Sequence, residues 1–133
     1  MKLYHASLNR RTLLAHNKCF PQRKVSVLRS FGMLDKEEKD FTNNHRSKVD
    51  SLIFDSGTFT LNYAKDGNTK HITLKNYINY LELFGHHFDF YFNFDSDFRD
   101  HGFETNHYNL KVLEGHGLFP VPVIHDIWGK EIY

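Results

Sequence analysis

The chain of 133 residues contains a single cysteine, Cys19, and this scarcity excludes several classes of protein. One thiol cannot close an intramolecular disulfide, and it cannot supply the paired thiolates of a C-x-x-C zinc site. The sequence also lacks the 18 or so consecutive apolar residues of a membrane span, and it begins without the apolar stretch of a signal peptide. We therefore expect a cytoplasmic protein without a membrane partner.

An excess of charge of one sign is also missing. The sequence has 17 Lys and Arg against 16 Asp and Glu, so the formal net charge is +1 and gives no signal for nucleic acid or for a membrane surface. Aromatic residues, by contrast, make up 16% of the chain and hydrophobic residues 40%, which is enough to build a core. Length and composition together predict one globular domain over residues 1–133.

Strand and helix patterns alternate along the chain. Strands are expected at residues 2–6, 25–31, 50–55, 88–94 and 119–125, and helices at residues 74–84 and 105–115. The helix at 74–84 has the clearest pattern, with apolar residues at helical spacing between Thr73 as N-cap and Gly85 as a stop. Residues 35–48 carry only a weak helix signal. This alternation predicts an α/β protein with a mostly parallel sheet of about five strands.

Three consecutive predicted strands end in an acid or a histidine. The third strand ends in Asp55, which is followed by Ser56 and Gly57. The fourth strand ends in Asp95 and the fifth in His125. Ligands of parallel α/β sheets bind outside the carboxyl ends of the strands, so these side chains are candidates for one site. Gly57 allows a tight turn, and the N–H groups that follow Asp55 are possible donors. An ordinary turn is the alternative interpretation of Asp-Ser-Gly.

The fourth predicted strand alternates between two kinds of side chain. One face carries the phenylalanines Phe88, Phe90, Phe92 and Phe94. The other face carries the polar residues Asp89, Tyr91, Asn93 and Asp95. In a barrel the phenylalanines would meet the outer helices and the polar face would point inward. A half-exposed antiparallel strand would show the same pattern, and the sequence does not choose between the two.

The acidic residues after the fourth strand allow a metal interpretation. An EF-hand that starts at Asp95 fails, because its sixth and twelfth positions are Asp100 and His107 rather than Gly and Glu. A divalent cation held by Asp95, Asp97 and a histidine stays open, as does a solvated acidic loop. We assign no metal ligands and no cofactor.

Residues 52–60, Leu-Ile-Phe-Asp-Ser-Gly-Thr-Phe-Thr, resemble the tRNA-guanine transglycosylase superfamily. That family carries Asp-Ser-Gly-Gly-Phe-Gln at the end of a barrel strand; here Thr58 replaces the second Gly and Thr60 replaces Gln. The strand that ends in Asp95 resembles the family's next strand. The final Pro-Val-Ile-His segment is similar to that of compact phage and plasmid relatives, some of them linked to 7-deazaguanine modification of DNA. The resemblance covers roughly residues 50–126.

The resemblance implies a partial (β/α)8 TIM-barrel-like fold and exchange of guanine for a 7-deazaguanine on tRNA or DNA. Asp55 would match the catalytic general acid/base, and Asp95 the carboxylate that binds the purine, with Ser56 and Gly57 shaping the base pocket. His125 is a further candidate for substrate binding, from its position at a strand end. Carboxylates suit this chemistry, since base exchange needs proton transfer and recognition of purine N–H donors.

The family's nucleophilic Asp and its Cys/His zinc site lie in later strands, and a full barrel takes about 200 residues or more. We therefore expect the N-terminal half of a barrel: a fragment, one half of a split enzyme, or a degenerate relative. The rival functions are a non-catalytic purine or nucleic-acid binding module and a small metal-dependent hydrolase that uses Asp55, Asp95 and His125. The apolar strand at 119–125 would leave an open sheet edge, which predicts a dimer or a complex with a second polypeptide.

Overall fold

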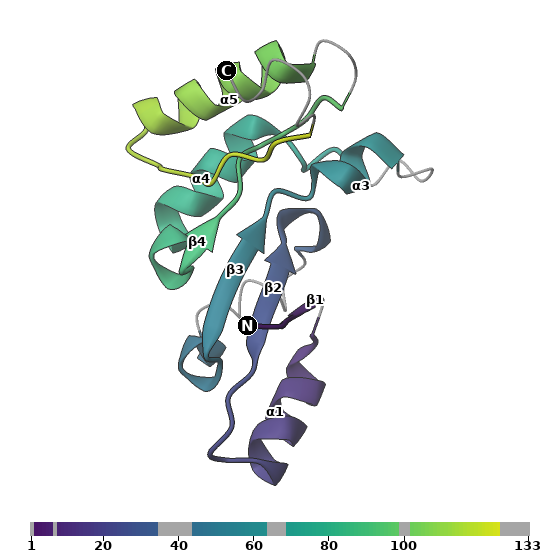
Figure 1. Cartoon of the computed structure of the whole chain (residues 1–133), viewed down its shortest axis with the longest axis vertical. Helices are drawn as coiled ribbons and strands as arrows, with labels where there is room; N and C mark the ends of the chain where they lie inside the picture. Colours follow the sequence, from purple (N-terminus) through teal and green to yellow (C-terminus); the bar gives the residue numbers. More distant parts are fainter. Residues whose placement is uncertain (1, 7, 35–43, 64–68, 99–101, 126–133) are drawn as a thin grey trace.

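The computed structural model describes residues 2–6, 8–34, 44–63, 69–98 and 102–125 (Figure 1). The strands are β1 (Tyr4–Ala6), β2 (Ser26–Ser30), β3 (Ser51–Asp55) and β4 (Phe90–Tyr91). The α-helices are α1 (Arg10–Cys19), α3 (Thr58–Tyr63), α4 (Leu74–Phe84) and α5 (Gly102–Gly115), and short 3-10 helices are η1 (Phe31–Met33), η2 (Arg46–Lys48) and η3 (Gly85–His87). No helix in these ranges is long and apolar enough to cross a membrane.

The four strands form one sheet in the order β1-β2-β3-β4, and every neighbouring pair is parallel. The α/β class and the parallel sheet predicted from the sequence are thus confirmed. The predicted β3 and β4 are neighbours, and α4 lies between them in the chain. A fifth position in the sheet is marked only by an isolated parallel bridge between Phe92 and Val121, so the expectation of five full strands is corrected to four strands and a bridge.

The last two predicted strands are shorter than their sequence pattern suggests. After Tyr91, side chains bind two of the backbone carbonyls: the Phe92 carbonyl accepts a hydrogen bond from the Tyr77 hydroxyl at 2.7 Å, and the Phe94 carbonyl accepts one from Asn109 Nδ2 at 2.7 Å. In the segment 119–125 the two prolines have no N–H to donate. Val121 alone makes ladder bonds there, to the Tyr91 carbonyl and from the Asn93 N–H.

The helices match the prediction best where the apolar period is strong. The helix α4 has the predicted bounds, and Thr73 caps it by accepting a hydrogen bond from the Asn76 N–H. The helix α5 begins at Gly102, three residues before the expected start. Neither α1 nor α3 was expected; of the segment 35–48, where the helix signal is weak, residues 44–48 are described, and they are helical and include η2.

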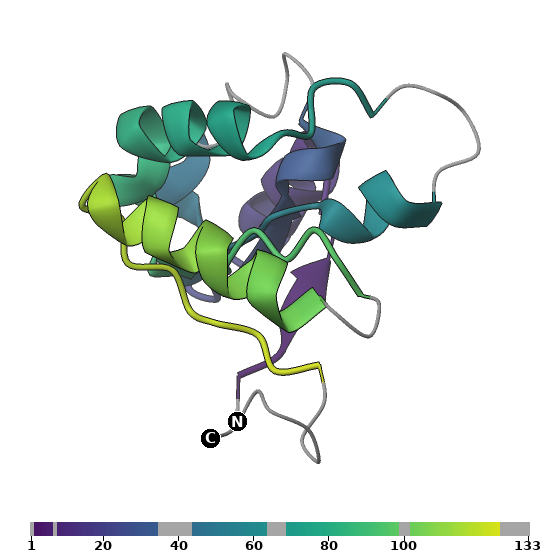
Figure 2. The ribbon, with the colours of Figure 1, turned by 90° about the horizontal axis from the view of Figure 1, so that it is seen from above.

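The core lies between the sheet and the helices. Phe54 of β3 is fully buried and stacks on Tyr77 and Tyr80 of α4 and on Phe88, with ring centroids 4.4 to 6.0 Å apart. Seen from above, α4 and α5 lie side by side next to the strands (Figure 2). Stacked aromatic rings therefore join β3 to α4.

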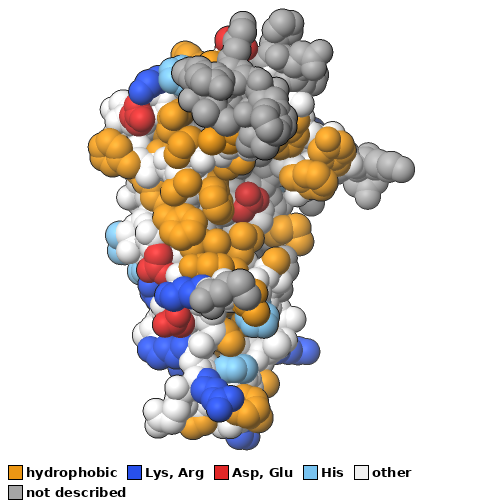
Figure 3. Space-filling model, viewed as in Figure 1, with side chains coloured by type: hydrophobic (Ala, Val, Ile, Leu, Met, Phe, Trp, Pro, Cys, Tyr) orange, Lys and Arg blue, Asp and Glu red, His pale blue; other side chains and the backbone are white. Residues whose placement is uncertain are grey.

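A barrel strand with an inward polar face would place Phe90 on the side of the helices and Tyr91 on the other side, and β4 has the reverse arrangement. Tyr91 is the register partner of Phe54, so it shares the face that meets α4, and its ring lies 3.8 Å from where a Cβ on Gly85 would stand. Phe90 pairs with Ile53 and so lies on the opposite face, where its ring meets that of Phe92. Figure 3 shows hydrophobic side chains gathered over the strands on the viewed face.

Candidate functional site

Asp55 is the last residue of β3, and its side chain is held from two sides. Its Oδ2 accepts a hydrogen bond from the Ser30 hydroxyl at 3.1 Å and another from the Gly57 N–H at 2.9 Å. Ser30 is the register partner of Asp55 at the end of β2, so the first contact joins the carboxyl ends of two neighbouring strands. The second oxygen, Oδ1, makes no hydrogen bond within the described residues, and Asp55 is half-buried. One carboxylate oxygen is thus fixed while the other can meet a ligand.

The turn after Asp55 depends on glycine. Gly57 has φ of +74°, and a Cβ built there would lie 2.1 Å from the backbone nitrogen of Gly32 in η1. Only a residue without a side chain lets the two loops approach so closely. The Ser56 hydroxyl is buried and pairs with Thr58 Oγ1 at 3.1 Å. Ser56 therefore shapes the turn through a buried contact, and the Gly57 N–H serves Asp55.

Asp95 lies three residues after the Phe92 bridge and is only 4% exposed. Its Oδ1 accepts a hydrogen bond from Asn93 Nδ2 at 2.6 Å, and its Oδ2 is 3.6 Å from Nε2 of His125. The imidazole of His125 also packs against the ring of Phe98, with the centroids 5.0 Å apart. Two of the residues selected from the sequence, Asp95 and His125, are therefore brought together.

Three buried asparagines hold the loop that carries Asp95. Asn106 of α5 makes a paired contact with the backbone of Asp97, accepting from its N–H at 3.2 Å and donating to its carbonyl at 2.8 Å. Asn109, one turn later, donates to the Phe94 carbonyl and to Ser96 Oγ. Asn93 donates to the Asn106 carbonyl at 2.9 Å as well as to Asp95. The loop that carries Asp95 is thus held by α5, while Asn93 holds the Asp95 carboxylate itself.

Tyr77 of α4 lies within electrostatic reach of both carboxylates. Burial raises the pKa of the Tyr77 hydroxyl well above its ordinary value, and the negative charges of Asp55 and Asp95 raise the pKa further. The hydroxyl is therefore neutral and donates to the Phe92 carbonyl. Asp55 ends β3 and Asp95 comes after the end of the parallel neighbour β4, so both acids follow the carboxyl ends of adjacent strands.

A second ionic cluster lies before β4, around Asp89. Its carboxylate accepts hydrogen bonds from the Ser51 hydroxyl, the Leu52 N–H and Arg46. Burial alone would raise the pKa of Asp89, but these hydrogen bonds and the charge of Arg46 outweigh it and lower the pKa. Asp89 precedes β4, whereas Asp95 follows it, so this cluster ties the opposite end of the sheet and has a structural role.

Sequence reasoning did not single out Ser30, Tyr77, Asn106 or Asn109. Ser30 could have been found, because it comes near the end of a predicted strand at the same edge as Asp55. The asparagines of α5 gave no such signal, since polar residues on a helix are usually exposed. In the described part of the chain, no group of three or more His, Cys, Asp or Glu side chains is placed to hold a metal ion.

Comparisons with protein-family models, with curated proteins and with solved structures found no match for this chain.

Proposed function

We propose that this domain binds a purine base and contributes an acid/base and a base-reading carboxylate to nucleoside base exchange on tRNA or DNA. The observation that carries the proposal is the pair of differently held carboxylates. Asp55 is the last residue of β3, and Asp95 comes after the end of the adjacent parallel strand β4; Ser30 and Gly57 hold the first carboxylate and Asn93 the second. Parallel α/β sheets bind ligands at that edge. The resemblance implies these roles, for Asp55 through residues 52–60 and for Asp95 through the strand that ends in it.

Asp95 is suited to recognition, because its carboxylate is rigidly placed. Guanine and 7-deazaguanine present adjacent N–H donors, and an ionised carboxylate offers acceptors only. Asn93 and the α5 asparagines fix the orientation of Asp95, and His125 beside it adds a group that can donate or accept. A preorganised acceptor of this kind loses little entropy when the base binds.

Asp55 is suited to proton transfer. The contacts from Ser30 and Gly57 hold Oδ2, and Oδ1 remains for the leaving or incoming base. The covalent nucleophile, in this proposal, comes from a later strand of a complete barrel, as the resemblance implies. A purine-binding module without catalysis would use the same Asp95 and would not need Asp55.

Calorimetric titration with guanine tests the recognition step. Wild-type protein is expected to bind, and Asp95→Asn to bind about tenfold or more weakly, since a hydrogen bond to a charged group contributes about 1.5–3 kcal/mol. Asp50→Asn is the control, because Asp50 is an exposed carboxylate that pairs with Lys2 outside this site. Equal affinity of the wild type and Asp95→Asn, or no binding of guanine to folded wild type, would refute the proposal.

A further inference from the structure

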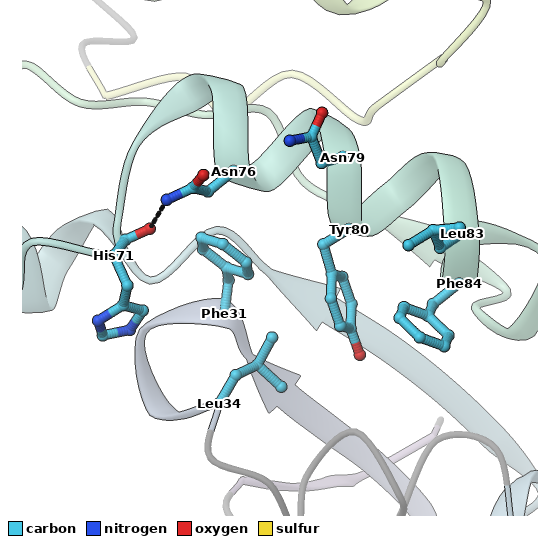
Figure 4. Close-up of a pocket in the computed structure, with 8 residues that line it drawn as sticks. All are labelled: Phe31, Leu34, His71, Asn76, Asn79, Tyr80, Leu83 and Phe84. Atoms are coloured by element: carbon cyan, nitrogen blue, oxygen red, sulfur yellow. Dashed lines mark hydrogen bonds between the residues drawn. The ribbon is translucent and has the colours of Figure 1, made fainter.

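A cavity of about 270 Å³ opens between η1 and one side of α4 (Figure 4). The helix contributes residues at the spacing i, i+3, i+4 and i+7, among them Asn76, Asn79, Tyr80 and Leu83. Phe31 of η1 faces them from the other wall. None of the residues that line the cavity belongs to the candidate site around Asp55 and Asp95. Its volume is close to the lower end of the range for small-molecule pockets, about 300 Å³.

Aromatic rings form the floor of this cavity. Phe31 and Tyr80 are each 5% exposed, and their ring centroids lie 5.8 Å apart. The planes of the two rings are inclined at 56° to each other, and because both rings are fixed in the core they offer rigid aromatic faces that cost little entropy to use. Leu83 at the rim is 66% exposed and leaves the mouth open. A floor of this kind favours a planar ring over a flexible aliphatic chain.

None of the described residues that line the cavity is an Asp, Glu, Lys or Arg, so none of them provides an ionic partner for a charged ligand. Asn76 and Asn79 of α4 line the cavity at its exposed side; Asn76 Nδ2 donates to the His71 carbonyl at 3.0 Å (Figure 4), and the Asn79 amide makes no hydrogen bond within the described residues. These amides can both donate to and accept from a ligand.

The imidazole of His71, which also lines the cavity, has an unpaired ring nitrogen. Its Nε2 is buried and has no hydrogen-bond partner, although buried polar atoms are nearly always paired. The imidazole packs near Phe31, with the centroids 6.1 Å apart. This unpaired nitrogen is therefore a candidate partner for a ligand bound in the cavity.

From these features we propose that the cavity binds a neutral, planar heteroaromatic molecule of one or two rings. The ligand lies against Phe31 and Tyr80, and its ring nitrogens bond to His71 and to the amides of Asn76 and Asn79. This site does not depend on base exchange, because it is built from different residues on the flank of α4.

Ligand-observed NMR titration with benzimidazole tests the proposal, with benzenesulfonate as the charged comparison. Wild-type protein is expected to bind benzimidazole saturably and to reject the anion. Leu83→Trp, which fills the mouth from an exposed position, is expected to weaken binding about tenfold or more. Leu3→Trp is the control, because Leu3 is 71% exposed and does not line the cavity.

His71→Phe keeps the ring and removes its nitrogens, so it is expected to weaken benzimidazole binding about three- to tenfold. Circular dichroism establishes that each variant is folded before titration. The proposal is overturned if the wild type shows no saturable binding, if the folded Leu83→Trp variant binds as the wild type does, or if benzenesulfonate binds equally well.

Discussion

Replacing Gly57 by alanine should destabilise the domain strongly, because two separate costs fall on one position. With φ at +74°, any residue with a Cβ pays about 1–2 kcal/mol for the left-handed backbone. The new Cβ would also lie 2.1 Å from the nitrogen and 2.5 Å from the Cα of Gly32. These are backbone atoms that cannot rotate away, so the loops after β2 and β3 must separate at a cost of about 1–3 kcal/mol.

Gly117→Ala is a matched control for the first cost. Gly117 has the same φ of +74°, yet a Cβ there meets no atom within 4 Å. We expect about 1–2 kcal/mol for Gly117→Ala and about 2–5 kcal/mol for Gly57→Ala. For a domain of this size, a difference of about 2 kcal/mol corresponds to roughly 6–10 °C in Tm.

Urea unfolding followed by circular dichroism measures both variants against the wild type. If Gly57→Ala and Gly117→Ala lose the same free energy of unfolding within about 0.5 kcal/mol, the close approach of Gly57 to Gly32 is wrong. The placement of Asp55 would then lose its support, because the Gly57 N–H is one of the two donors that hold it.

Three further predictions concern pH, activity and association. The lowered pKa of Asp89 stabilises the folded state above the unfolded pKa of about 3.9, and this stability is lost as the pH falls through the folded pKa. The urea midpoint of Asp89→Asn should therefore change less between pH 3 and 6 than that of the wild type; the same change of midpoint with pH in both proteins would contradict this. The polypeptide of residues 1–133, assayed alone with labelled guanine and tRNA or duplex DNA, should incorporate no label, because Asp55 and Asp95 supply no covalent nucleophile; robust incorporation would show that one has been overlooked. We also propose a dimer or a complex with a second polypeptide through residues 119–125, where Ile124 is 50% exposed; in light scattering of the protein alone, Ile124→Lys should dissociate a dimer that Tyr108→Lys leaves intact, and a wild-type monomer at high concentration would exclude the dimer.

The elements that could be predicted from sequence are those whose pattern reflects burial on one side. The helix α4 is amphipathic over its full length and is capped by Thr73, so both its existence and its bounds could be predicted. The strand β3 is a short apolar run and lies within one residue of its predicted start. In both cases one local signal and the tertiary contacts agree.

The elements that were missed have weak local signals. The helix α1 buries only Leu13, and its start depends on the side chain of Asn9, which accepts from the Thr12 N–H. The helix α3 has six residues and contains β-branched and aromatic side chains that favour strands. Such helices form because neighbouring elements hold them, and a single sequence does not display those neighbours.

The candidate site was predictable only in its outline. Three strand ends with Asp55, Asp95 and His125 could be aligned because parallel strands place their carboxyl ends at one edge. The contacts that orient the acids come from distant residues, such as Ser30 for Asp55 and Asn106 for the loop of Asp95. The side-chain bonds that shorten β4 are of the same kind, and no periodicity in the sequence reveals them.

A crystal structure of the domain with bound guanine tests the central claim most directly. The account predicts that the base lies at the carboxyl edge of the sheet, with its N–H donors about 3 Å from the carboxylate oxygens of Asp95 and with Asp55 within hydrogen-bond distance of the ring. A structure in which guanine leaves this edge empty, or in which Asp55 and Asp95 face different surfaces, would contradict it.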